Sequence, residues 1–164
     1  MRRAFLLALV LCVAGPACGK GDDSGDRSLL ELRPVVAATP PPCPEKAPTK
    51  DELIRPLTTD GKVECLELGR PIVDAADVRS ASVGKTPAGA SALSVVLGRV
   101  GSANLDGFAQ RNQGKRLAIL ADGDVTSAPE LRFFSFAGRI QVTGLSPEKT
   151  DHLFRRLNKL IEPG

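Results

Sequence analysis

Few side chains in this chain have the type and spacing that catalysis requires. His152 is the only histidine, so a catalytic triad or a histidine-based metal site has almost no partners. Asp122 and Asp124 flank Gly123 and could touch a cation, but paired acids in a tight turn are more often solvated. No group of residues supplies a nucleophile, a base and an orienting partner. We therefore expect a non-catalytic protein with no metal site and no cofactor.

Two glycine-containing stretches resemble nucleotide-binding loops only superficially. Gly84-Lys85-Thr86 matches the end of a phosphate-binding loop, but Arg79 stands where that motif needs its first glycine. Residues 98–101 (GRVG) lack the spacing of a dinucleotide fingerprint. Both stretches are predicted to be turns or loops.

The N-terminal residues are typical of an export signal. Arg2 and Arg3 precede an apolar run over 4–15, which has the length of a signal peptide rather than of a membrane span. Ala17-Cys18 at its end resembles a lipobox, which predicts a signal peptide over 1–17 and a lipid anchor on Cys18. Cleavage by ordinary signal peptidase, leaving Cys18 as a free thiol, is the alternative. Gly19 stands where inner-membrane lipoproteins typically have Asp, which favours the outer membrane.

Apart from Cys18, two cysteines remain in the mature chain, because Cys12 leaves with the signal peptide. Cys43 and Cys65 are an even pair in an exported protein, and such pairs usually form disulfides. Two free thiols are the alternative. A metal site is less favoured, because no histidine or further cysteine lies at ligand spacing.

The composition allows one domain after this leader. The chain has 164 residues, of which 42% are hydrophobic and 4% aromatic, without Trp or Tyr, so the core must be aliphatic. The net charge of +3 includes Arg2 and Arg3, and the other basic residues are interspersed with acids. We therefore expect no binding of nucleic acid, which requires a concentrated basic face.

Hydrophobic patterns and turn signals predict an α+β fold. A flexible tether over 18–28 precedes the domain, which spans 29–164. The C-terminal helix is the clearest element: Ser146-Pro147-Glu148 starts it, and an apolar stripe continues to Ile161. A shorter helix is predicted to begin at Ser102 or Asn104 and to end at Gly114. Strands are predicted at 29–38 (an edge strand because of Pro34), 63–67, 79–83, 90–97, 116–121, 124–128, 133–136 and 139–143, with a helical turn within 73–78 and a hairpin turn at Asp122-Gly123. Two helices with antiparallel strands indicate a sandwich in which both helices cover one face of the sheet.

The second half of the chain resembles a known family. Its motifs are Gly114-Lys115-Arg116-Leu117-Ala118-Ile119, then Asp122-Gly123-x-Val125-x-Ser127-Ala128-Pro129, then Gly138-Arg139-x-Gln141-Val142-Thr143-Gly144. These resemble the head subdomain of the first periplasmic domain of SecD, an accessory subunit of the protein translocase. The resemblance extends over about 29–161, weakly in the first third. The family motif has Gly at the position of Ala137.

The resemblance implies an α+β, ferredoxin-like sandwich and a role beside the Sec machinery. It suggests a free-standing head on a lipid tether that binds unfolded secreted polypeptides in the cell envelope. The alternative is a structural or adaptor lipoprotein that docks on a Sec-like envelope complex. The motif residues Gly114, Asp122, Gly123, Ser127, Ala128, Pro129, Gly138 and Gly144 also have a purely structural explanation as turn and cap residues.

Overall fold

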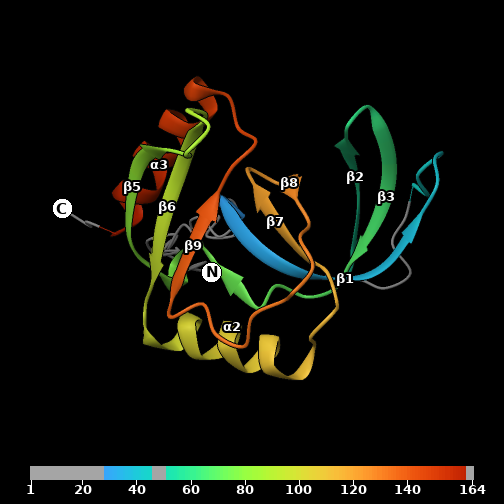
Figure 1. The fold of residues 1–164 in the computed structure, drawn as a ribbon, viewed down its shortest axis with the longest axis horizontal. Helices are drawn as coiled ribbons and strands as arrows, with labels where there is room; N and C mark the ends of the chain where they lie inside the picture. The colour runs from blue at the N-terminus through green and yellow to red at the C-terminus, as the bar shows by residue number, and fades with distance from the viewer. Residues whose placement is uncertain (1–27, 46–50, 162–164) are drawn as a thin grey trace, which may run out of the picture.

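The computed structural model describes residues 28–45 and 51–161. The predicted signal peptide, Cys18 and almost all of the predicted tether lie outside the described residues. The elements, shown in Figure 1, are β1 (Leu30–Thr39), β2 (Leu53–Thr59), β3 (Lys62–Leu68), β4 (Val73–Asp74), the 3-10 helix η1 (Ala75–Asp77), β5 (Val78–Lys85), β6 (Ser91–Leu97), α2 (Arg99–Arg111), β7 (Leu117–Ala121), β8 (Asp124–Ser127), β9 (Arg139–Val142) and α3 (Pro147–Ile161). Within the described ranges, no helix is long and apolar enough to span a membrane.

The strands form two antiparallel sheets. The larger sheet has the order β2-β3-β1-β7-β8, with β4 also pairing with β1, and the smaller has the order β5-β6-β9. α3 packs on β5 and β6, and α2 contacts β4 and β6. The α+β class with antiparallel strands and two helices is confirmed. Sequence patterns did not reveal that the strands are divided between two sheets.

β1 joins the parts of the larger sheet. Its first half, Leu30 to Pro34, pairs with β7, and its second half, Val35 to Thr39, pairs with β3. The prediction that this segment is an edge strand is therefore wrong. Pro34 is tolerated because it lies where β1 changes partner, and its carbonyl accepts a hydrogen bond from the Gly69 N–H (2.9 Å).

Two hydrophobic cores lie against these sheets. The main core is aliphatic, as expected, and lies among β1, the smaller sheet and both helices; fully buried members include Leu93, Leu105, Leu153 and Leu157. A smaller core lies beneath the β2–β3 hairpin and is made of Leu57, Leu66, Leu68, Ala118 and Leu120. β2 approaches β8 at the far end of the same sheet, and Arg55 Nε donates to the Gly123 carbonyl (3.1 Å). The larger sheet therefore curls around the smaller core.

A disulfide joins Cys43, after the end of β1, to Cys65 in β3. This is the pair expected from the sequence. The cross-link closes a loop of 22 residues that includes β2, which stabilises the fold by about 3 kcal/mol in the chain-entropy model.

Several local predictions were incomplete or wrong. Gly84 and Lys85, which were expected in a turn or loop, are the last residues of β5. β2 was not predicted, although it ends in an Asp60-Gly61 turn with positive φ at both residues (51° and 74°), like the predicted turn at Asp122-Gly123. Residues 133–136 are not a strand. α2 begins at Arg99 after Gly98, so part of the predicted loop 98–101 is helical and neither Ser102 nor Asn104 is the N-cap. The helix ends at Arg111 with Asn112 as its C-cap, so the predicted end at Gly114 is wrong.

Candidate functional site: a groove between two strand edges

The largest cavity described here is a groove of about 770 Å³ between the β2–β3 hairpin and the unpaired edges of both sheets. Leu57, Ile119 and Ala128 provide apolar surface, and Leu57 and Ile119 are buried. Most other lining side chains are neutral and polar. They are Thr58, Thr59, Thr126, Ser127, Gln141 and Thr143, and the remaining lining residues are Asp60, Glu64, Arg116 and Pro129. We call this cavity the strand-edge groove.

The groove takes its name from β8 and β9. β8 is the outer strand of the larger sheet and pairs with β7, while β9 is the outer strand of the smaller sheet and pairs with β6. Among the strands of residues 28–45 and 51–161, each therefore has one edge without a neighbour in its sheet. A free strand edge presents N–H and C=O groups that can pair with another extended chain.

Thr126 distorts β8 inside the groove. The register changes between the Ile119↔Ser127 and Leu120↔Val125 pairs, so Thr126 is the extra residue of a β-bulge. Its hydroxyl donates to the Ile119 carbonyl (3.1 Å). A bulge redirects the side chains that follow it, and Ser127 and Ala128 both line the groove.

Arg116 and Glu64 form a charged bridge across one end of the groove. Arg116 Nη1 donates to Glu64 Oε2 (2.9 Å), its Nη2 contacts Oε1, and its Nε donates to the Ala128 carbonyl (3.0 Å). The hydrogen bonds from Arg116 hold the pKa of the Glu64 carboxyl below its usual value, and those same bonds raise the pKa of Arg116. The bridge therefore joins β3 to both the start of β7 and the end of β8.

The groove continues past β8. A second cavity of about 340 Å³ shares Leu57, Thr58 and Thr126 with it and extends to Gly144 and Lys149. The two cavities together give an open path along the edge of β8.

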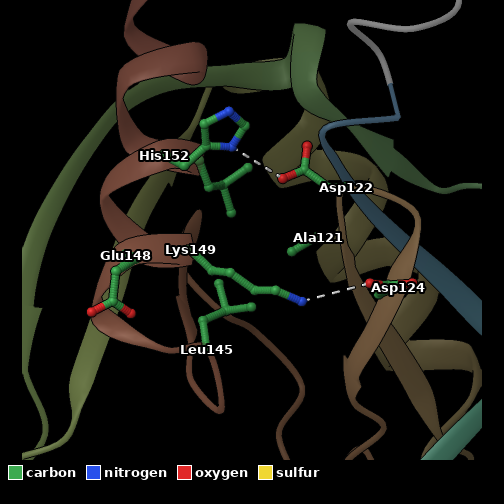
Figure 2. A pocket seen from close by; sticks show the side chains of 8 residues that line it. Ala121, Asp122, Asp124, Leu145, Glu148, Lys149 and His152 are labelled. Atoms are coloured by element: carbon green, nitrogen blue, oxygen red, sulfur yellow. Dashed lines mark ion pairs between the residues drawn. The ribbon is translucent and has the colours of Figure 1, made fainter.

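A third cavity of about 280 Å³ lies between α3 and the β7–β8 turn, and Figure 2 shows it from close by. His152 Nδ1 lies 3.6 Å from Asp122 Oδ2, and Lys149 Nζ lies 3.8 Å from Asp124 Oδ2. Asp122 also accepts a hydrogen bond from Arg156 (2.9 Å). The two acids of the turn thus attach the hairpin to α3, and no Ser, Thr or Cys lines this cavity. In the described part of the chain, no three His, Cys, Asp or Glu side chains cluster as a metal site would require.

A fourth cavity of about 530 Å³ follows the outer half of β1. It is lined by Pro34, Val35, Val36, Ala37, Ala38, Phe108, Asn112, Lys115 and Arg116. Arg116 therefore separates this cavity from the strand-edge groove.

Comparison with known proteins gives one consistent result. The family model described as "SecDF, P1 head subdomain" matches residues 52–159.

The chain belongs to the SecDF P1 head family.

Individual relatives agree with this assignment. Protein translocase subunit SecD of Aquifex aeolicus is 34% identical over 121 residues, which is 73% of this chain and 24% of that protein. A solved structure titled "Structure and function of a membrane component SecDF that enhances protein export" has a TM-score of 0.58 at 26% identity and covers 81% of this chain and 63% of its own. A structure of SecDF in a super-membrane-facing form has a TM-score of 0.57 at 24% identity, over 84% of this chain and 19% of its own, and supports the fold. The chain thus spans about a quarter of the translocase subunit that it matches.

The family motif has two locations in the structure. Ser127, Ala128 and Pro129 line the strand-edge groove, and Asp122 lies on the α3 side of the hairpin. The glycines serve the backbone: Gly114, Gly123, Gly138 and Gly144 all have positive φ. The motif therefore contains residues that line the groove and glycines whose positive φ values form the turns between elements.

Sequence reasoning missed the opposite wall of the groove. Thr58 and Thr59 on β2, and the Glu64–Arg116 pair, were not singled out as site residues. The Asp60-Gly61 dipeptide is the signal that could have revealed this wall, because it predicts a hairpin that brings 53–59 beside 62–68.

Proposed function

We propose that this SecDF P1 head domain binds extended polypeptide in the strand-edge groove, and that it does so without catalysing a reaction. The observation that carries the proposal is the convergence of two unpaired strand edges on one groove. An incoming chain can add to such an edge through main-chain hydrogen bonds.

The lining supports binding of chains of varied sequence. Hydroxyl and amide side chains can hydrogen-bond to any peptide backbone, and the apolar surface at Leu57, Ile119 and Ala128 accepts small hydrophobic side chains. The charged groups Glu64 and Arg116 are already paired with each other. We expect a transient complex with a Kd of about 1 μM or weaker.

The proposed setting is the cell envelope. We propose that residues 1–17 are a signal peptide, that Cys18 carries a lipid anchor, and that 18–28 is a tether for the domain on the periplasmic side, with the outer membrane favoured. Family membership and the relatives named for protein export support a role in that process. Labelled fatty acid should enter the wild type and not Cys18→Ser; label that persists in the variant would contradict the anchor.

Binding is tested by hydrogen exchange of the full chain with an unfolded secretory polypeptide. We expect protection of amides in β8 and β9, and loss of that protection in Thr58→Trp, which fills the groove from an exposed position on β2. Ser82→Trp, an exposed position on β5, is the matched control and should bind normally. Protection that survives Thr58→Trp would overturn the assignment of the groove.

The second candidate is an adaptor that docks on a Sec-like envelope complex. It is favoured by the relative that is itself a translocase subunit. If no unfolded polypeptide binds while one envelope protein is captured by crosslinking, the adaptor role replaces the polypeptide-binding role.

A further inference from the structure

Phe133 and Phe134 are neighbouring aromatic side chains that project into solvent. They are 69% and 63% exposed, and Val100 on α2 is 67% exposed. The other aliphatic and aromatic side chains of comparable size are mostly buried in the two cores or packed against them. Contiguous exposed apolar patches are uncommon on monomeric proteins and often mark contact surfaces.

The backbone segment that carries the pair is held against α2 and the residues that follow it. This segment, between β8 and β9, runs alongside the helix (Figure 1). The Leu131 N–H donates to the Lys115 carbonyl (2.8 Å), and the Phe136 N–H and Ser135 hydroxyl donate to Asp106 (2.7 and 3.0 Å). Phe133 and Phe134 therefore lie on a short segment fixed at both ends.

The same part of the molecule is positively charged. Residues 99–116 and 129–139 contain six Arg or Lys and two acids, Asp106 and Glu130. The other described residues contain ten Arg or Lys and thirteen acids. The net charge of the described residues is close to zero because a positively charged region around α2 is balanced by an excess of acids elsewhere. We call the basic, aromatic end the α2 surface; its exposed members are Arg99, Val100, Arg111, Lys115, Arg132, Phe133 and Phe134.

We propose that the α2 surface docks on an anionic phospholipid surface. Phe side chains can insert at the boundary between lipid headgroups and acyl chains, and nearby cations are attracted to anionic headgroups. Phe133, Phe134 and Val100 line none of the four cavities described above, so the aromatic pair is presented outward. Because lipid rearranges around an inserted side chain, an outward-facing aromatic pair can enter the membrane surface without a preformed pocket. Docking would place this surface against the bilayer independently of any lipid on Cys18 and of polypeptide binding.

The test uses the full chain reconstituted into vesicles, so that a lipid anchor cannot by itself decide the result. Hydrogen exchange over 112–116 and 131–137 is compared between phosphatidylcholine vesicles and vesicles that also contain phosphatidylglycerol. We expect slower exchange with phosphatidylglycerol only, and its reversal at high salt, because salt screens surface charge.

Two variants and one control locate the effect. Arg132→Gln should weaken the response about fivefold, since one cation near an anionic surface contributes about 1 kcal/mol. Phe133→Ser with Phe134→Ser should weaken it about tenfold or more. Val83→Ser with Lys85→Gln, which removes an exposed apolar and a basic side chain from β5, should leave it unchanged.

Two results would overturn the proposal. The first is equal exchange with both kinds of vesicle. The second is protection of the α2 surface by an acidic protein when phosphatidylglycerol vesicles give none, which would assign the surface to a protein partner.

Discussion

At the scale of single residues, Arg116 and Glu64 form an ion pair that lines the strand-edge groove. Three hydrogen bonds from one guanidinium join β3 to the backbone after β8. Both side chains are about one-third exposed (32% and 34%), so solvent screens the pair. We therefore expect the ion pair mainly to hold the β2–β3 hairpin in position beside β8, and to contribute little to the stability of the whole fold.

The bridge makes stability depend on pH. Because the folded-state pKa of Glu64 is lowered, its contribution is present above the ordinary carboxyl pKa and is lost as the pH falls through the lowered value. Glu64→Gln should destabilise the protein by about 0.5–1 kcal/mol at pH 7 and should show a smaller loss than the wild type between pH 7 and pH 3. Urea melts at both pH values measure this, with Glu67→Gln on the same strand as the control. Parallel losses in wild type and Glu64→Gln would contradict it.

Ala137 stands where the family motif has a glycine, and its φ is 48°. An L-residue in this left-handed region costs about 1–2 kcal/mol, and glycine avoids this at an entropic cost of about 0.5–1 kcal/mol. Ala137→Gly should therefore raise the free energy of unfolding by about 0.5–1 kcal/mol. Ala103→Gly, at an exposed position in α2, should lower it by about 1 kcal/mol. A thermal melt compares them, and a destabilised Ala137→Gly protein would refute the strain.

At the scale of elements, the C-terminal helix could be predicted because local chemistry and packing agree. Ser146 Oγ accepts a hydrogen bond from the Lys149 N–H (3.3 Å), and Leu153 and Leu157 are fully buried. Leu157→Ala should lower the free energy of unfolding by about 2–5 kcal/mol. Lys159→Ala, on the exposed side, should change it by less than about 0.5 kcal/mol. Equal effects in urea melts would show that the stripe does not face the core.

Other elements depend on contacts that no local pattern reveals. The start of α2 is one, since Gly101 packs so closely on Asp77 that an added Cβ would lie 2.6 Å from the Asp77 Cβ. Helix propensity alone treats that glycine as a breaker. β1 is another, because Pro34 favours an edge in isolation, whereas pairing with two successive partners makes the strand central. The family motif in the sequence thus indicates the groove residues on the β8 side. The position of β2 on the opposite side depends on the curl of the larger sheet, which the sequence does not reveal.

At the scale of the whole molecule, two cores of unequal size predict unequal stability. The main core joins β1, both helices and the smaller sheet, whereas the smaller core has five buried residues under the β2–β3 hairpin. Regions with fewer buried contacts open locally at lower free energy than the global unfolding. The hairpin wall of the strand-edge groove is therefore expected to open before the rest of the fold.

Paired core substitutions test this division. Leu66→Ala in β3 and Leu93→Ala in β6 each remove a fully buried leucine. Leu66→Ala should speed hydrogen exchange mainly in β2 and β3, because the smaller core supports that hairpin whereas the main core holds the remainder. Leu93→Ala should speed exchange in both sheets, since the main core supports both. If polypeptide binds between the hairpin and β8, Leu66→Ala should also weaken binding more than Leu93→Ala does at a temperature where both variants stay folded. Identical exchange patterns in the two variants would mean that the cores unfold as one cooperative unit, and the groove would then open only by global unfolding.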